Sequence, residues 1–229
     1  MPNFKNNLKP LSFYVFGDSI CFGQLVSPHL TWGAKLSSSL NKIKNQKNPV
    51  LVQNASVNGN TTRLALERMT YDVTSHNPDF VMIQFGMNDC NYWLTDKGSP
   101  RVSKSSFASN LEEIIDRAVI NKVKYIILNT NHPSLMGKVN PILNLKHSQS
   151  NSDYNEIIRE TYLKLKKNKY PISLIDIERL WIEYFYRNKK SSISDYLLED
   201  KVHLSKNGHD LYSKLVVPRI IKNLEVFIS

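Results

Sequence analysis

Short apolar runs alternate with stretches of helical periodicity along the chain. Most of the runs are bounded by Gly, Pro, Asn or Asp, which is typical of buried strands that end in turns. This pattern predicts five strands, at residues 13–17, 49–54, 78–85, 123–129 and 172–176. Between and after them, apolar residues recur every three or four positions. That spacing predicts helices at residues 30–43, 64–74, 106–120 and 154–167, an aromatic-rich helix or turn at 181–186, and a last helix from 204 onward, bent at Pro218.

Strands that alternate with helices predict an α/β fold, in which helices cover both faces of a parallel sheet. Two polar segments, residues 91–105 and 131–150, lack periodicity, and we interpret them as long loops of functional importance. The chain contains no linker, internal repeat or low-complexity segment. We therefore predict a single domain over residues 1–229, with its core at about 11–227.

The composition, with 41% hydrophobic and 22% charged residues, is that of an ordinary globular protein. The formal net charge is +10, but the lysines are spread along the sequence and form no basic block interleaved with aromatic residues. That distribution favours solvated helix faces over a nucleic-acid partner. No apolar run is long enough to span a bilayer, and residues 1–10 contain no apolar signal segment. We expect a cytoplasmic location.

Two cysteines and six histidines show no metal-binding spacing. Cys21 and Cys90 do not make a disulfide framework either, so we expect buried free thiols. Instead, polar residues follow the predicted strands, where the ends of parallel strands meet at one edge of the sheet. These loops carry a serine, an acid and a histidine that suit nucleophilic catalysis.

Ser19 directly follows the first strand, and a serine becomes a nucleophile when a base takes its proton. His203 is the candidate base, and Asp200, three residues earlier, can accept the other imidazole proton and fix the tautomer. Taken alone, each motif has a simpler interpretation: Asp18-Ser19 as a turn or helix cap, and Asp200 and His203 as a capping acid and a surface histidine. Their convergence on one sheet edge favours catalysis.

An attacked ester carbonyl develops a negative charge that needs hydrogen-bond donors. The backbone N–H of Gly59, the side-chain amide of Asn88 and the backbone N–H of Ser19 are candidates, each in a loop that follows a predicted strand. The alternatives are again ordinary ones: Gly59 as a turn residue with positive φ, and Asn88 as a residue whose side chain bonds its own turn.

Four blocks of the sequence together resemble the SGNH (GDSL-type) hydrolases. They are Gly17-Asp18-Ser19-Ile20, Gly59 within Asn58–Thr62, Gly86-Met87-Asn88-Asp89 and Asp200-Lys201-Val202-His203, and they occur in the family's order over about residues 13–212. The chain departs from the family in three places: Ile20 replaces a common leucine, Lys201 a frequent glycine and Leu204 a frequent proline. The Gly-x-Ser-x-Gly elbow of the α/β-hydrolases is absent around Ser19.

The resemblance implies a three-layer α/β/α sandwich of flavodoxin-like type around a five-stranded parallel sheet. It implies ester hydrolysis through an acyl-enzyme, with no metal or organic cofactor. Ser19 would be the nucleophile, His203 the base and Asp200 its orienting acid. The Ser19 and Gly59 backbone amides and the Asn88 side chain would form the oxyanion hole.

The substrate is the open question. The two long loops are the expected pocket walls, and the expected substrate contacts are Asp18, Tyr92, Trp93, Arg101 and His132. Tyr92 and Trp93 can equally pin their loop to the core. Because the loops are too polar for a long acyl chain, we expect a small acyl group such as acetyl on a carbohydrate or another polar alcohol. The alternatives are an acyltransferase with the same triad, a lipase- or thioesterase-type acylhydrolase, and a non-catalytic binding module.

Overall fold

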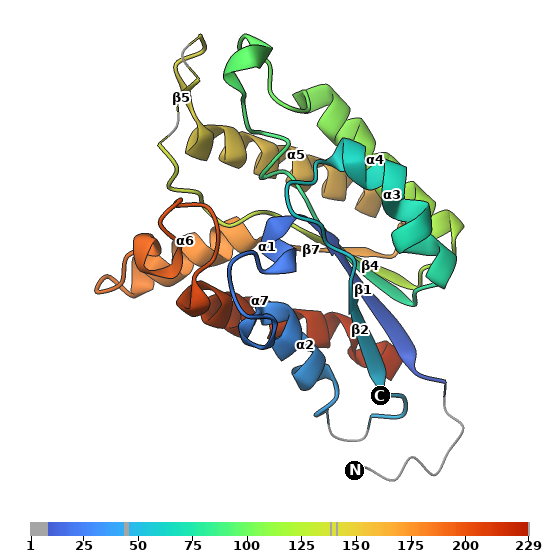
Figure 1. Cartoon of the computed structure of the whole chain (residues 1–229). Coiled ribbons are helices and arrows are strands. Elements are labelled where there is room, and N and C mark those ends of the chain that lie inside the picture. The colour runs from blue at the N-terminus through green and yellow to red at the C-terminus, as the bar shows by residue number, and fades with distance from the viewer. Residues whose placement is uncertain (1–8, 44–45, 138, 141, 229) are drawn as a thin grey trace.

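The computed structural model describes residues 9–43, 46–137, 139–140 and 142–228 and shows a five-stranded, purely parallel sheet (Figure 1). The strands lie in the order β2-β1-β3-β4-β7. Their bounds are Leu11–Gly17 (β1), Val50–Asn54 (β2), Phe80–Gln84 (β3), Tyr125–Asn129 (β4) and Ile172–Ile175 (β7). The predicted flavodoxin-like sheet is confirmed. Its chain order reverses between β1 and β3, and this switch point is where open α/β sheets bind ligands.

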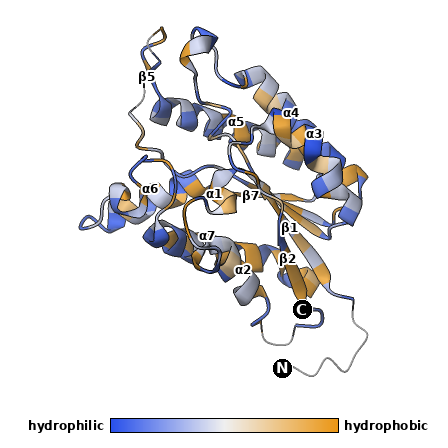
Figure 2. Cartoon of the chain, in the orientation of Figure 1, coloured by the Kyte–Doolittle hydropathy of each residue, from blue (hydrophilic) through white to orange (hydrophobic). Residues whose placement is uncertain are grey.

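Helices cover both faces of the sheet, as predicted (Figure 1). One layer packs into the first hydrophobic core and consists of α2 (Trp32–Leu40), α6 (Ile177–Arg187) and α7 (Lys206–Ile228). The other layer packs into the second core and consists of α3 (Thr62–Asp72), α4 (Lys104–Ile120) and α5 (His147–Lys167). Successive residues of β3 alternate between the cores: Phe80 and Met82 face the first, Val81 and Ile83 the second. Figure 2 accordingly shows mainly hydrophobic strands between helices of mixed polarity.

Short elements occupy the connections. They are α1 (Ser19–Phe22), the 3₁₀ turns at Pro28–Leu30, Thr74–His76, Leu94–Asp96 and Ile193–Tyr196, and an antiparallel pair formed by β5 (Val139–Asn140) and β6 (Leu145–Lys146). The predicted loop at 91–105 is largely irregular and is closed by an isolated antiparallel bridge between Tyr92 and Pro100. Both cysteines are free and buried, as expected.

The main error of the pattern analysis concerns α5. The helix begins at His147 instead of residue 154, so the second predicted loop is shorter than 131–150. Its first two turns bury polar residues, His147, Ser150 and Asn151, where the analysis looked for apolar ones. Smaller differences occur at the ends of other elements: α2 ends at Leu40 instead of residue 43, and α7 continues through Pro218.

Residues 1–8 lie outside the described part of the chain, so the absence of a signal segment and the cytoplasmic location remain predictions. Within the described residues, no helix is long and apolar enough to cross a membrane.

Candidate active site

Ser19 follows the carboxyl end of β1, an inner strand of the sheet, as the first residue of α1. Gly17 allows the chain to turn there, because a Cβ at this position would lie 2.7 Å from the Cys21 sulfur and 2.8 Å from the Gln84 carbonyl oxygen. Asp18 caps the helical turn by accepting a hydrogen bond from the Ile20 amide at 2.9 Å. The turn leaves the Ser19 hydroxyl at the carboxyl end of the parallel strands.

The loop before α7 brings an acid and a base to this hydroxyl from 184 positions away. Oδ1 of Asp200 accepts hydrogen bonds from the backbone amides of Val202 and His203, both at 2.9 Å. Its other oxygen, Oδ2, lies 2.6 Å from Nδ1 of His203. Nε2 of His203 lies 2.8 Å from Oγ of Ser19. Because Asp200 accepts the proton on Nδ1, Nε2 is left to accept the Ser19 hydroxyl proton.

The electrostatics of the loop suit this arrangement. Burial pushes the pKa of Asp200 up, but hydrogen bonds from the His203 ring and from two backbone amides outweigh it and leave that pKa below its usual value. Asp200 is therefore ionised at neutral pH and can stabilise a positively charged His203. The predicted Ser19, His203 and Asp200 thus form one hydrogen-bonded line.

Gly59 and Asn88, the other two predicted members of the site, lie in the loops after β2 and β3. Gly59 has φ +76°, and nothing lies within 4 Å of the position its Cβ would take, so the left-handed backbone is the reason for a glycine here. Nδ2 of Asn88 lies 3.4 Å from Oδ2 of Asp18. Since Asp18 directly precedes Ser19, this contact places the Asn88 amide near Ser19.

Two buried carboxyl groups underlie the site. Asp18 is fully buried, which raises its pKa to about 7, and the nearby charge of Asp89 adds to the effect. Burial likewise raises the pKa of Asp89 to about 6, although its Oδ1 accepts hydrogen bonds from the Thr62 amide at 2.8 Å and the Thr62 hydroxyl at 2.5 Å. Among the described residues, Oδ2 of Asp89 has no hydrogen-bond partner.

The five predicted substrate contacts separate into two groups. Trp93 is 51% exposed, the guanidinium of Arg101 lies 4.7 Å from the centre of its ring, and both residues line a cavity of about 640 Å³. Tyr92 is partly buried and pairs its backbone with Pro100, beside that cavity. Asp18 and His132 are fully buried, so neither offers a surface to a substrate in this structure.

His132 instead contacts the loop that carries Asp200 and His203. Its Nε2 lies 2.8 Å from the backbone oxygen of Val202. Val202 lies between Asp200 and His203, and its own backbone amide donates a hydrogen bond to Asp200. Burial lowers the pKa of His132 to about 4, so the ring is neutral and donates this hydrogen bond. The loop that carries His132 is held by α5, through Asn151 to the His132 carbonyl oxygen at 3.0 Å.

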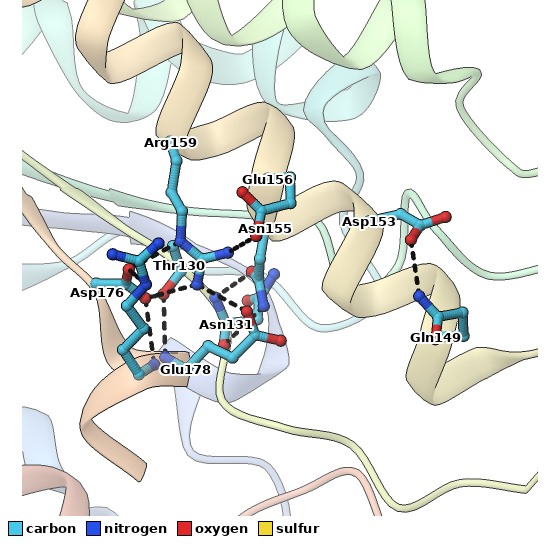
Figure 3. Close-up of polar contacts among 10 residues, drawn as sticks. Thr130, Asn131, Gln149, Asp153, Asn155, Glu156, Arg159, Asp176 and Glu178 are labelled. Atoms are coloured by element: carbon cyan, nitrogen blue, oxygen red, sulfur yellow. Dashed lines mark hydrogen bonds and ion pairs between the residues drawn. The ribbon is translucent and has the colours of Figure 1, made fainter. Parts of the chain in front are cut away.

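Figure 3 shows how α5 fixes the same loop one and two residues earlier. The side chain of Asn155 exchanges two hydrogen bonds with the backbone of Asn131, at 2.8 and 3.0 Å. Next along the helix, Arg159 binds Asp176 through Nε and Nη2, both at 2.8 Å, and Glu178 at 2.7 Å. Asp176 in turn accepts a hydrogen bond from the Thr130 hydroxyl at 3.2 Å. This network joins the ends of β4 and β7 to α5.

Arg68 is another supporting residue that the sequence analysis missed. It lies on α3 and donates hydrogen bonds to the Gly17 carbonyl at 3.2 Å, the Ala55 carbonyl at 2.6 Å and the Asn60 side chain at 2.5 Å. It thereby ties the end of β1 to the loop that carries Gly59. In the sequence Arg68 is one polar residue on a helix, and backbone acceptors leave no pattern that would reveal its role.

Among the described residues, no three His, Cys, Asp or Glu side chains are grouped to hold a metal ion. The cysteines near the site are not alternative nucleophiles. Burial raises the pKa of both Cys21 and Cys90, so their thiols stay protonated.

Comparison with known proteins identifies the family. The family model described as GDSL-like lipase/acylhydrolase matches residues 13–216. The chain belongs to the GDSL-like lipase/acylhydrolase family. This GDSL-family protein is therefore an ester hydrolase, and a serine nucleophile with a catalytic triad is characteristic of the family.

The relatives of this GDSL hydrolase extend the comparison. It is 20% identical over 210 residues to an arylesterase from Vibrio mimicus, covering 92% of this chain and 88% of that protein. It is 35% identical to the uncharacterized lipoprotein YqeF of Bacillus subtilis (strain 168) over 77 residues, which are 34% of this chain but only 31% of that protein. The crystal structure of an acetylxylan esterase from Geobacillus stearothermophilus matches it with a TM-score of 0.70 and 20% identity, over 95% of both chains.

Proposed function

We propose that the protein is a serine esterase in which Ser19 is the nucleophile, His203 the general base and Asp200 its orienting acid. The observation that carries this proposal is the unbroken line of hydrogen bonds, 2.6 Å from Asp200 to His203 and 2.8 Å from His203 to Ser19. These distances lie within the range for direct proton transfer between a nucleophile and its base.

The reaction follows from the geometry. Oγ of Ser19 attacks the ester carbonyl while Nε2 of His203 takes its proton. The oxyanion is held by the backbone amides of Ser19 and Gly59 and by Nδ2 of Asn88. The tetrahedral intermediate collapses as His203 returns the proton to the departing alcohol, which leaves an acyl-serine. Water, activated by His203, then attacks the acyl-serine and releases the carboxylic acid.

For the substrate we propose a small acyl group, such as acetyl, on a carbohydrate or similar polar alcohol. The exposed ring of Trp93 and the cavity of about 640 Å³ beside it support a sugar-sized group, because aromatic rings pack well against the apolar face of a sugar. The acetylxylan esterase that shares this fold supports the same class. Product analysis with acceptor sugars distinguishes hydrolysis from acyl transfer by the same triad.

A lipase-type substrate is the second candidate, and a specific observation favours it. The two loops expected to form the pocket walls expose large apolar side chains: Leu94 at 78%, Ile142 at 62% and Leu143 at 54%. The loops also touch, because a Cβ at Gly98 would lie 3.4 Å from Ile142. These side chains provide a surface that a long acyl chain can cover.

A screen of p-nitrophenyl esters from acetyl to dodecanoyl, followed by acetylated xylan oligosaccharides, tests the substrate class. We expect the highest kcat/KM with acetyl esters, whereas a preference for long chains would favour the lipase-type alternative.

The catalytic roles are tested separately. Ser19→Ala and His203→Ala should abolish turnover in a folded protein, and a fluorophosphonate should label wild-type protein at Ser19 in a 1:1 ratio.

Asn88→Ala tests the oxyanion hole. We expect kcat to fall by about a hundredfold or more, because one donor to the developing charge is lost. A nearly normal kcat in this variant would remove Asn88 from the hole while leaving the triad assignment intact.

A further inference from the structure

We propose that Arg101 positions the oxyanion hole, by holding the Asn88 amide and the Gly59 turn in the orientation that catalysis needs. Nη1 of Arg101 lies 3.3 Å from Oδ1 of Asn88, and Nη2 lies 3.1 Å from the backbone oxygen of Gly59. One guanidinium thus joins the two residues that come from the loops after β2 and β3. The inference rests on the proposed function, which places Asn88 and Gly59 in the hole.

The chemistry of the guanidinium determines which way the Asn88 amide faces. Arginine has only donors, so it accepts no hydrogen bond from an amide NH₂ and selects the oxygen of Asn88. Nδ2 must then point to the other side, toward Asp18 and the adjacent Ser19. If the Asn88 amide were flipped, its NH₂ would face the Arg101 guanidinium and its oxygen would face the Asp18 carboxyl, so both hydrogen bonds would be lost. Donation to Oδ1 by a cation also polarises the amide and strengthens Nδ2 as a donor.

The Gly59 turn requires support from outside. Gly59 is exposed, its φ is +76°, and the turn is closed by a single backbone hydrogen bond of 3.2 Å from the Asn60 amide to Val57. Arg68 holds the far side of this turn through the Asn60 side chain at 2.5 Å. Arg101 holds the near side through the Gly59 carbonyl, which restricts the peptide plane that follows the proposed oxyanion donor.

Arg101 is itself well placed to act as a fixed support. Its guanidinium stacks on Trp93 at 4.7 Å, and its backbone amide donates to the Asn91 carbonyl at 2.9 Å. The next amide, that of Val102, donates to the Asp89 carbonyl at 3.1 Å. Trp93 and Arg101 also line the cavity proposed for the alcohol part of the substrate. A substrate in that cavity would therefore touch the same side chain that aligns the hole.

The simpler alternative is that Arg101 only attracts an anionic substrate. Arg187 provides the control, because it is an exposed arginine on α6 that pairs with Glu183 at 4.0 Å and does not line this cavity. A neutral substrate separates the two roles. An electrostatic role would leave the hydrolysis of p-nitrophenyl acetate unaffected, whereas a positioning role would lower its kcat.

The test measures kcat and KM for p-nitrophenyl acetate with Arg101→Met, Arg101→Lys and Arg187→Met, with active sites counted by fluorophosphonate titration run to completion. For Arg101→Met we expect kcat to fall by about tenfold to a hundredfold at nearly constant KM, since an interaction made in the transition state is weakened. Arg101→Lys should retain an intermediate kcat, because one ammonium cannot bridge both oxygens in the planar geometry. Arg187→Met, which also removes one positive charge, should match the wild type.

A double-mutant cycle with Asn88→Ala completes the test. If Arg101 acts mainly through Asn88, Arg101→Met should cause little further loss in the Asn88→Ala background. The inference would be overturned by a wild-type kcat in Arg101→Met or by a change confined to KM. It would also be overturned if the double variant lost kcat by the product of the two single-variant factors, because the residues would then act independently. Failure of the proposed hole is distinguishable, because Asn88→Ala alone would then keep a nearly normal kcat.

Discussion

At the scale of single residues, the most unusual backbone in the site belongs to Lys201. It lies between Asp200 and His203 with φ +63°, a left-handed conformation that costs an L-residue about 1–2 kcal/mol. This explains why glycine is frequent at this position in the family that the motif resembles. The turn persists because the Lys201 amide donates to Leu198 at 2.9 Å and its carbonyl accepts from Leu135 at 3.0 Å.

Lys201→Val should therefore destabilise the protein by about 1–2 kcal/mol, because a β-branched residue is poorly tolerated at positive φ. Since this turn joins the acid and the base, kcat should fall too. Lys201→Asn is the control: asparagine adopts this conformation more readily, so its stability should stay within about 0.5 kcal/mol of the wild type. Urea unfolding of both variants makes the comparison, and equal stabilities would show that the turn carries no strain.

Residue chemistry predicted some of the site and missed the rest for a physical reason. Ser19, Asn88 and His203 were predicted to converge because a serine, an amide and an imidazole in loops at one end of the sheet are recognisable residue types. In the structure His203 contacts Ser19, and Asn88 contacts the adjacent Asp18. The roles of Arg68 and Arg101 were not found, since each acts on backbone oxygens 51 and 42 positions away. His132 was predicted to contact substrate, but its full burial gives it a different partner, the Val202 carbonyl.

At the scale of elements, α5 shows where hydrophobic periodicity stops being informative. Strand patterns located all five sheet strands because their apolar residues face the two cores. The first turns of α5 instead face the polar loop at residues 130–132, and their inward side is made of hydrogen-bonding residues. A pattern that counts apolar positions cannot detect such a face, which is why the predicted helix began seven residues too late.

This polar face makes a prediction for stability. Asn155→Ala leaves the buried amide and carbonyl of Asn131 without their partners, and we expect a loss of about 2–4 kcal/mol. Gln149→Ala is the matched control on the exposed side of the same helix, where the side chain donates to Asp153 at 3.0 Å (Figure 3). It should change stability by less than about 0.5 kcal/mol. Urea unfolding measures the free energy of unfolding of both variants. Similar losses would contradict a stabilising role for the inward polar face of α5.

At the scale of the whole molecule, the switch point of the sheet buries acids in a basic protein. The chain carries a formal net charge of +10, yet Asp18 and Asp89 lie together with no exposed surface. Composition cannot predict this, because burial follows from the fold. A carboxyl that is harder to ionise in the folded chain than in the unfolded one makes stability depend on pH.

Asp18 sets the sign of that dependence. Burial, with the neighbouring charge of Asp89, raises its pKa from an ordinary 3.8 to about 7, so the folded protein binds this proton more tightly than the unfolded chain does. Its contribution to stability is therefore complete below about pH 4 and is lost as the pH rises through about 7.

Asp18→Asn stays neutral at every pH, so we expect its stability relative to the wild type to increase between pH 4 and 7, at up to about 1.4 kcal/mol per pH unit, and then to level off. Urea unfolding across this range gives the measurement, with Asp210→Asn as the control because it removes an exposed acid. A relative stability of Asp18→Asn that stays flat or decreases with pH would mean that Asp18 is already ionised in the folded protein at low pH, held by its hydrogen bonds from the Ile20 amide and Asn88.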